Sequence, residues 1–276
     1  MDFSIIIVSW KVKDLLKKCL RSIESARGDL TLEIFVVDND SQDGTVEMVK
    51  HDFPQVNPVK YGEAVNFSKK NLFNGVKLIA SDKNFGFARA NNLALKQATG
   101  EYALLLNPDT ELKADTLSHA LEFMKRSPDC GVLGPKMFYP DGSLQPSVRR
   151  FPTVWPILLM LLKLPKIFPH LKSIDRYLAV DFDYSKEQEV DQVMGAFMLM
   201  PKKVIEQVGL LDERFFVWFE EVDLCRRIKA AGFKIIYSPS VSIVHHGGKS
   251  FKQQAIISTQ WRFFASALKY FLKHGI

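Results

Sequence analysis

The sequence predicts an α/β fold in which a mostly parallel, Rossmann-like sheet is flanked by helices. Three observations favour this class. Short apolar segments rich in Ile, Val and Leu recur through the first 140 residues, as in strands that are buried on both faces. Segments with apolar residues at helical spacing lie between them. Polar residues follow the apolar segments directly, where ligands bind on open α/β sheets.

The first half of the chain alternates regularly between the two periods. The predicted order is strand 3–9, helix 14–23, strand 32–38, helix 41–51, strand 76–81, helix 87–99, strand 101–107 and helix 114–126. Leu16, Cys19 and Leu20 lie on one stripe of the first helix. Ser41 or Asp43 can cap the second, and Gly100 ends the third.

The second half is less regular. Residues 139–145 (YPDGSLQ) indicate a hairpin turn, and residues 151–190 are irregular, basic and rich in proline. The elements predicted after them are strand 190–201, helix 201–208, a helix ended by Gly232, and short strands at 233–239 and 241–248. We expect one domain over residues 1–250, with halves at 1–127 and 128–250, followed by an amphipathic helix at 251–276.

Composition places few constraints on function. The 276 residues are 47% hydrophobic and 25% charged, as in an ordinary globular domain. Residues 1–4 lead directly into an apolar strand without a basic region or cleavage site, so no signal peptide is expected. The three cysteines have no zinc-binding spacing, which favours a reduced cytoplasmic protein without a structural metal.

Two segments carry most of the positive charge. Residues 145–176 hold six basic residues and one acid, and residues 249–276 hold five basic residues and no acid. In the second segment, the residues that share a helical spacing are Trp261, Phe264, Ala265, Leu268 and Leu272 on one face and Arg262, Ser266, Lys269 and Lys273 on another. Two interpretations of residues 151–176 and 256–273 follow. Both segments contact a membrane surface peripherally, or both pack on the domain with their lysines in solvent. The apolar run 154–162 is too short to span a bilayer, and the absence of a recognised motif argues against nucleic acid.

Polar clusters at the predicted strand ends are candidates for a ligand site. Asp38 can accept a hydrogen bond from a nucleoside or form a local turn. Residues 84–92 (NFGFARANN) place a glycine before a helix, and such a helix start can bind phosphate. Asp109, in LLLNPDTEL, can hold Mg²⁺ or Mn²⁺ or serve as a turn residue.

Two later segments carry acids and histidines. Glu220, Glu221 and Asp223 follow a run of aromatic residues. Aromatic surroundings can raise the pKa of a carboxylate toward the range useful for a general base, but acids also favour the first turn of a helix. His245 and His246 end an apolar run, and either can offer an imidazole to a metal.

Taken together and in order, these segments resemble the family 2 glycosyltransferases with a GT-A fold. The segments that carry the resemblance are VSWKVKDLLKKCLRSI, VVDNDSQDGT, NFGFARANN, LLLNPDTEL, DGSLQPSVRRFPT, GAFMLM, LLDERFFVWFEEVDLCRR and YSPSVSIVHHGGKS. They are most similar to the bacterial rhamnosyltransferase-like enzymes of cell-wall and surface-polysaccharide synthesis. The resemblance covers roughly residues 3–250. It implies a GT-A-type fold with a nucleotide-binding half (1–127) and a variable acceptor and catalytic half (128–250).

The resemblance implies a role for each matching residue. The nucleotide-binding positions would be Ser9, Asp38, Asn84, Gly86, Arg89, Asn91 and Asn107. Asp109 and His245 would bind Mg²⁺ or Mn²⁺. Glu221 would be the catalytic base, with Glu220 and Asp223 as rivals. Two features depart from the family pattern: Glu221 stands where an Asp is usual, and residues 55–75 lengthen the link before the third strand.

The implied activity is inverting, metal-dependent sugar transfer from a nucleotide-diphosphate donor to a glycan or lipid-linked glycan. By resemblance dTDP-rhamnose is the favoured donor and a UDP-sugar the next. The expected location is the cytoplasm, with peripheral contact to the inner face of the cell membrane. Two alternatives remain open: a sugar-nucleotide nucleotidyltransferase, and a non-catalytic subunit that binds nucleotide sugars.

Overall fold

The structure is a computed structural model that describes residues 1–53, 57–60, 73–164, 170–247 and 256–275. Most of the 55–75 insert lies outside these residues. Its described parts belong to β3 (Asn57–Lys60) and to the start of β4 (Phe73–Ala80). The strand predicted at 76–81 therefore begins three residues earlier than expected.

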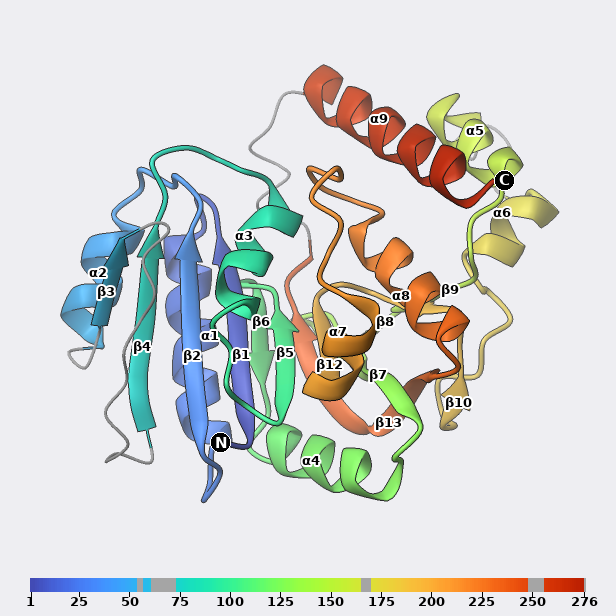
Figure 1. The fold of residues 1–276 in the computed structure, drawn as a ribbon. Helices are drawn as coiled ribbons and strands as arrows, with labels where there is room; N and C mark the ends of the chain where they lie inside the picture. Colours follow the sequence, from blue (N-terminus) through green and yellow to red (C-terminus); the bar gives the residue numbers. More distant parts are fainter. Residues whose placement is uncertain (54–56, 61–72, 165–169, 248–255, 276) are drawn as a thin grey trace.

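One large mixed sheet forms the centre of the molecule (Figure 1). Its first part is parallel and has the order β3-β4-β2-β1-β5. The new strands here are β1 (Phe3–Ser9), β2 (Leu32–Asp38) and β5 (Tyr102–Leu106). β12 (Phe197–Pro201) then pairs antiparallel with β5 and joins it to β7 (Cys130–Phe138), which runs parallel to β13 (Lys234–His245). The expected mostly parallel α/β architecture is confirmed.

Shorter strands complete the second half. β6 (Thr110–Leu112) and β10 (Gln188–Glu189) pair with β13, and β8 (Leu144–Gln145) pairs with β7. β9 (Val148–Arg149) and β11 (Gln192–Val193) form a separate two-stranded sheet.

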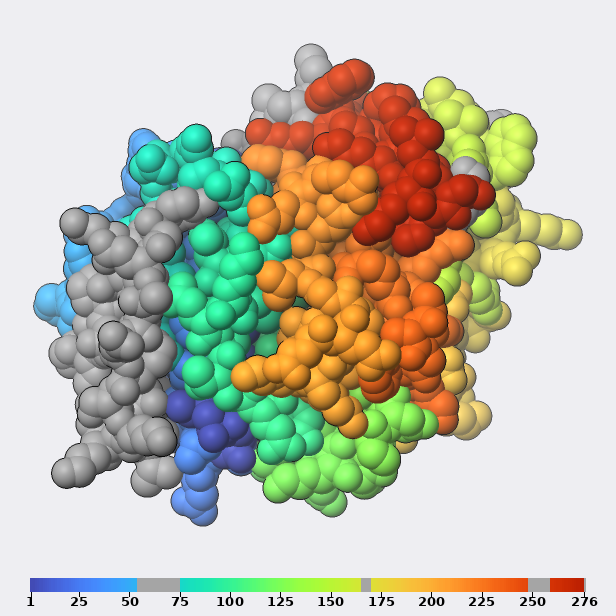
Figure 2. Space-filling model, viewed as in Figure 1, coloured from blue at the N-terminus to red at the C-terminus, as the bar shows by residue number. Residues whose placement is uncertain are grey.

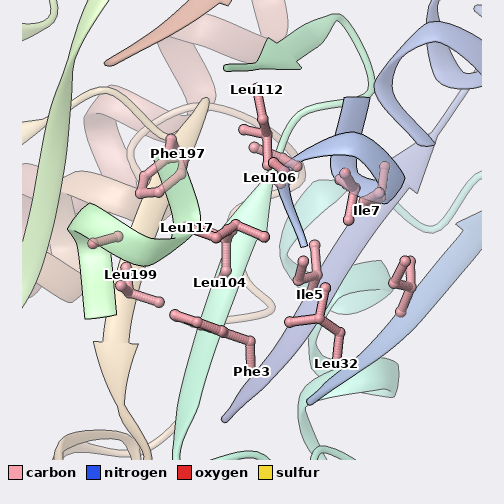
Figure 3. Close-up of a cluster of buried hydrophobic side chains, with 14 of the residues drawn as sticks. Phe3, Ile5, Ile7, Leu32, Leu104, Leu106, Leu112, Leu117, Phe197 and Leu199 are labelled. Carbon is pink, nitrogen blue, oxygen red and sulfur yellow. The ribbon is translucent and has the colours of Figure 1, made fainter. Parts of the chain in front are cut away.

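Alternate residues of the central strands face two layers of helices. Phe3, Ile5 and Ile7 of β1 belong to the cluster that packs under α1 (Lys13–Ala26), α2 (Thr45–Asp52) and α4 (Thr116–Arg126), part of which Figure 3 shows. Ile6 and Val8 belong to the opposite cluster, with α3 (Phe87–Leu95), α7 (Lys202–Val208) and α8 (Glu220–Ala230). Both faces are covered, which explains why the strands are apolar without alternation.

Some predictions for the second half were wrong in detail. The predicted strand 190–201 divides into β11 and β12, which lie in different sheets. The two strands predicted at 233–239 and 241–248 are a single strand, β13, whose pairing is irregular between Ser238 and Ser242. Residues 151–190, expected to be irregular, contain α5 (Val154–Leu161) and α6 (Lys172–Tyr177).

The C-terminal helix α9 (Ile256–His274) packs beside α5 and over the segment that precedes α8 (Figures 1 and 2). A third apolar cluster joins these elements and consists of Ile157, Phe215, Phe219, Val222, Ala267 and Tyr270. Among the described residues, no helix combines the length and apolarity needed to cross a membrane.

α9 packs on the domain, as the packed-helix interpretation expected, but not through the apolar face that the sequence predicted. Trp261 and Leu272 of the predicted apolar face are 68% and 75% exposed, and Phe264 and Leu268 are exposed with them. Lys269 instead donates a hydrogen bond inward to the Arg214 carbonyl oxygen at 2.6 Å. Lys269 thus helps to attach the helix while it remains exposed, and the predicted apolar face points outward.

Candidate active site

The polar strand ends converge because the parallel strands are in register. Ser9 of β1 pairs with Asp38 of β2, and Asp38 pairs with Ala80 of β4. A cavity of about 410 Å³ opens beyond this edge. Its lining residues include Trp10, Asn39, Asn84, Gly86, Asn107 and Asp109 from the first half and Gln145, Gly195, Trp218, Glu220, Glu221 and His245 from the second. Six of the ten residues proposed from the resemblance as binding, metal-ligating or catalytic positions therefore meet at one cavity: Asn84, Gly86, Asn107, Asp109, Glu221 and His245.

Ser9 and Asp38 lie at the base of this edge rather than among the lining residues. Both are buried, and the Ser9 hydroxyl and Oδ1 of Asp38 have no hydrogen-bond partner among the described residues. Burial raises the pKa of Asp38, while the hydrogen bond from the Ser41 N–H at 3.2 Å opposes the shift. Buried polar atoms without partners are uncommon in folded proteins, so these two atoms are available to a ligand.

Asn39 organises the loop before α3, a role that the sequence analysis did not predict. Its Oδ1 accepts a hydrogen bond from the Phe85 N–H at 2.9 Å, and its Nδ2 donates to Oδ1 of Asn84 at 2.9 Å. Oδ1 of Asn84 also accepts a hydrogen bond from the Gly86 N–H. The signal in the sequence is the position of Asn39 directly after β2, at the strand end that also carries Asp38.

Gly86 allows the two halves to approach closely. Its φ is +84°, and a Cβ atom there would lie 2.4 Å from the Phe216 carbonyl oxygen. The same oxygen accepts a hydrogen bond from the Phe87 N–H at 2.7 Å. Only glycine adopts this φ freely and leaves room for the neighbouring main chain.

Arg89 and Asn91 do not line the cavity. Arg89 is exposed, with its guanidinium 4.5 Å from the centre of the Phe85 ring. Asn91 is buried in α3, and its side chain donates a hydrogen bond to the Phe87 carbonyl oxygen at 2.9 Å. Asn91 therefore contacts its own helix rather than the cavity.

Asp109 and His245 face one another across β6 and β13. Nε2 of His245 lies 3.3 Å from Oδ1 of Asp109, and both side chains are almost fully buried. Nδ1 of His245 is 2.8 Å from Oε1 of Gln145. When Nδ1–H donates to Gln145, the neutral ring presents the Nε2 lone pair toward the carboxylate.

This pair fits a divalent cation. Nε2 of His245 is buried and makes no hydrogen bond among the described residues. A lone pair facing a carboxylate at 3.3 Å is unfavourable unless a cation attracts both. A hydrogen bond to the other ring nitrogen, as from Gln145, is how metal-binding histidines are usually oriented. The described residues contain no group of three or more such ligands, so a bound cation would need further oxygen atoms from substrate or water.

Glu111 and His246 pair with each other instead. Nε2 of His246 lies 2.6 Å from Oε1 of Glu111, and neither residue lines the cavity. The Asn107 carbonyl oxygen accepts hydrogen bonds from the Thr110 N–H and hydroxyl, which closes the turn that carries Asp109.

Glu220 and Glu221 form an acidic pair at the start of α8, in which Glu220 is buried and Glu221 is half-buried. Burial raises the pKa of Glu220 well above its ordinary value, and the Glu221 charge raises it further. Burial also raises the pKa of Glu221. One carboxylate oxygen of each residue is buried without a hydrogen-bond partner among the described residues. A carboxylate held in this way is well suited to accept a proton from a substrate.

Asp223, the third acid, is used elsewhere. It is fully buried and does not line the cavity. Its carboxylate contacts Nε of Arg227 at 2.9 Å, Nζ of Lys273 at 2.6 Å and Nε2 of His274 at 2.9 Å. Asp223 therefore joins α8 to the end of α9, which explains its presence without a catalytic role.

The backbone before the acidic pair is strained. Trp218 and Phe219 have φ values of +64° and +69°. A non-glycine residue in this region costs on the order of 1–3 kcal/mol and persists where its surroundings fix it. The Phe219 carbonyl oxygen accepts the Asp223 N–H at 2.9 Å, so this unusual turn sets the start of α8.

Comparison with known proteins identifies the family of the chain. A family model described as "Glycosyl transferase family 2" matches residues 4–208, which is well over half of the 276 residues. The chain belongs to glycosyl transferase family 2. It is a glycosyltransferase of the rhamnosyltransferase-like branch. The family assignment favours this prediction over a nucleotidyltransferase or a non-catalytic subunit.

Curated relatives support the branch. The chain is 26% identical over 260 residues to "N-acetylglucosaminyl-diphospho-decaprenol L-rhamnosyltransferase" of Mycobacterium tuberculosis, and the match covers 89% of this chain and 76% of the relative. It is 29% identical to "Rhamnosyltransferase WbbL" of Escherichia coli, over 62% of this chain and 66% of the relative.

Solved structures confirm the GT-A-type fold. The mannosyltransferase PcManGT from Pyrobaculum calidifontis, in complex with GDP-Man and Mn²⁺, matches with a TM-score of 0.59 and 19% identity, over 96% of this chain and 68% of that chain. S. aureus TarS matches with a TM-score of 0.57 and 16% identity, over 91% of this chain but 38% of that chain.

Proposed function

We propose that the protein transfers a sugar from a nucleotide-diphosphate donor to a glycan or lipid-linked glycan, with inversion at the anomeric carbon. Rhamnose is the favoured sugar, for synthesis of a bacterial surface polysaccharide. The observation that carries this proposal is the shared cavity, where the Asp109–His245 pair lies with the acids Glu220 and Glu221.

The proposed reaction is a single displacement. A carboxylate oxygen of Glu221 accepts the proton of the acceptor hydroxyl as that oxygen attacks the anomeric carbon. The bond from this carbon to the diphosphate oxygen breaks, and its electron pair leaves with the nucleoside diphosphate. The transition state is oxocarbenium-like, as in glycoside hydrolysis. One protein carboxylate suffices, because the departing diphosphate needs no general acid.

Asp109 and His245 would hold the divalent cation. The cation supplies positive charge that stabilises the leaving diphosphate. A carboxylate oxygen combined with an imidazole nitrogen favours Mn²⁺ over Mg²⁺. The residues proposed to contact the nucleotide are Ser9, Asp38, Asn84, Gly86 and Asn107. Arg89 and Asn91 would reach the nucleotide only after movement of α3, or would act on it indirectly through that helix.

The donor is tested with a panel of nucleotide sugars in the presence of Mn²⁺. We expect release of dTDP from dTDP-rhamnose to exceed release of UDP or GDP from the corresponding hexose donors. The acceptor would be a short polyprenyl-diphosphate sugar of the kind named for the mycobacterial relative. NMR of the product would show the anomeric configuration. Retention of configuration would contradict the mechanism, and turnover of a UDP-hexose alone would contradict the rhamnose assignment.

We also propose that the protein works at the inner face of the cell membrane, where a lipid-linked acceptor would lie. Two adjoining helices, α5 and α9, each expose a row of apolar residues. These residues are Trp155, Leu158 and Leu162 on and after α5, and Trp261, Phe264, Leu268 and Leu272 on α9. Both rows lie in the basic segments of the sequence. Exposed tryptophan and leucine beside an excess of positive charge suit an anionic lipid interface.

Replacing Trp261 and Leu272 with serine is expected to weaken membrane binding. Full burial of one large apolar side chain contributes about 1.5–3 kcal/mol, so loss of two partly buried ones should lower affinity by at least about tenfold. Sedimentation with vesicles of phosphatidylglycerol and phosphatidylethanolamine measures this. Leu144→Ser is the matched control, because Leu144 is 40% exposed on β8 and belongs to neither row. Equal sedimentation of the double variant and the unmodified protein would refute the surface.

A further inference from the structure

Helix α9 faces the candidate active site with one side and solvent with the other. Its outward row consists of Trp261, Phe264, Leu268 and Leu272. Its inward side carries Phe263, Ser266 and Tyr270, of which Ser266 and Tyr270 are buried. These inward residues contact the segment 214–219, which ends directly before Glu220 and lines part of the cavity.

Two inward residues contact the strained turn itself. The Ser266 hydroxyl donates a hydrogen bond to the Val217 carbonyl oxygen at 2.8 Å. The Phe263 ring lies edge-on to Trp218, with centroids 5.7 Å apart, and its centroid is 5.4 Å from that of Phe219. The three residues of the turn are thus all held from α9.

These contacts explain why the turn can remain left-handed. Two consecutive aromatic residues with positive φ leave this conformation unless packing fixes them. Hydrogen bonding of the Val217 carbonyl and packing of both following rings supply that restraint. The direction in which α8 begins, and with it the position of the Glu221 carboxylate, depends on the turn.

We propose that Phe263 and Ser266 are positioning residues of the candidate active site, which hold Val217–Phe219 so that Glu221 enters the cavity. The inference rests on the proposed role of Glu221 as the base. Neither residue lines the cavity, so both would act through the turn. A base displaced by about 1 Å can lose up to two orders of magnitude in rate.

The test compares Ser266→Ala and Phe263→Leu with the unmodified protein. We expect kcat for sugar transfer to fall between about ten- and a hundredfold. The donor KM and the Mn²⁺-dependent affinity for nucleoside diphosphate should remain unchanged, since Phe263 and Ser266 contact the turn Val217–Phe219 rather than the proposed nucleotide-binding residues. Ser118→Ala is the matched control, because the Ser118 hydroxyl donates to the Asp115 carbonyl oxygen at 2.9 Å on α4. Unchanged kcat in both α9 variants, or an equal rise in donor KM, would overturn the proposal.

A second readout does not depend on transfer. Labelling the four tryptophans with 5-fluorotryptophan gives ¹⁹F signals, and Trp218→Phe assigns the one from the turn. Ser266→Ala should shift or broaden the Trp218 signal and leave the Trp10 signal unchanged. If the protein transfers no sugar but the Trp218 signal moves, the proposed function fails and the positioning contact stands. If transfer is normal and the signal does not move, the positioning role is wrong.

Discussion

Glu221→Gln is expected to lower the rate of sugar transfer by about two to four orders of magnitude, the range attributed to a general base. Glutamine keeps the shape of the side chain but cannot accept the acceptor proton. Binding of the nucleotide sugar should be unchanged, because the proposed donor contacts lie at the ends of β1, β2, β4 and β5. Single-turnover transfer assays and calorimetry with the donor measure the two effects separately.

The pH dependence provides a second measure of the same residue. The base must be ionised, and burial raises the pKa of Glu221 above the ordinary value of 4.5. The acidic limb of the kcat/KM profile should therefore lie above pH 4.5 and disappear from the residual activity of the glutamine variant. A raised pKa in the folded state means that ionisation of Glu221 costs stability as the pH rises through that range. Glu221→Gln should accordingly unfold at a temperature equal to or above that of the unmodified protein at neutral pH, with the difference lost in acid.

Glu220→Gln distinguishes the two members of the pair. Glu220 is more deeply buried, and its pKa is raised further by the Glu221 charge, so it is expected to be neutral and to support packing. Loss of transfer in Glu220→Gln with retention in Glu221→Gln would reverse the assignment. Asp223 is not a useful test of the base, because its replacement would leave Lys273 and His274 without their common partner.

Asp109→Ala is expected to abolish the effect of Mn²⁺ on nucleoside-diphosphate binding. His245→Ala should also reduce the effect of Mn²⁺ on nucleoside-diphosphate binding, because Nε2 of His245 and Oδ1 of Asp109 lie 3.3 Å apart and face the same point. Gln145→Ala should reduce Mn²⁺ affinity by about 10- to 100-fold, as loss of a residue that orients a metal-binding histidine typically does. Titration of the nucleotide with and without Mn²⁺ measures all three.

Glu111→Ala is the matched control for Asp109→Ala. Both acids lie in the same turn and adjoining strand, but Glu111 pairs with His246 outside the cavity. Its replacement should leave the response to Mn²⁺ unchanged. Equal loss in the two variants would show a general effect on the turn rather than a metal site at Asp109.

The parallel half of the fold could be predicted because each of its strands and helices shows its own pattern of apolar residues within a short stretch of sequence. Residues 3–9 and 32–38 are continuously apolar, and the helices between strands show a clear stripe. The second half could not be predicted in the same detail, because its order depends on distant pairing. Nothing local indicates that β12 enters between β5 and β7, or that β11 leaves the main sheet. The exposed row on α9 shows a further limit, since periodicity identifies an apolar face but does not identify its partner.

The site residues that directly follow the ends of parallel strands could be predicted from the sequence. Asn84, Asn107 and Asp109 line the cavity because parallel strands end at one edge. Arg89 and Asn91 share a motif with Asn84, but the helix that begins at Phe87 turns them away from the cavity lining. Gln145 could not be predicted, because its role depends on a contact with His245, one hundred positions away.

The antiparallel strand β12 limits how the site can open. Its five residues pair with β5, from Phe197 with Leu106 to Pro201 with Tyr102, so the sheet is continuous between the two halves. A hinge between the halves would have to break this ladder. Substrate entry and product release should therefore not depend on closure of two lobes. The sheet edge where the Asn107 N–H donates to the Ala196 carbonyl oxygen would stay fixed while donor and product exchange.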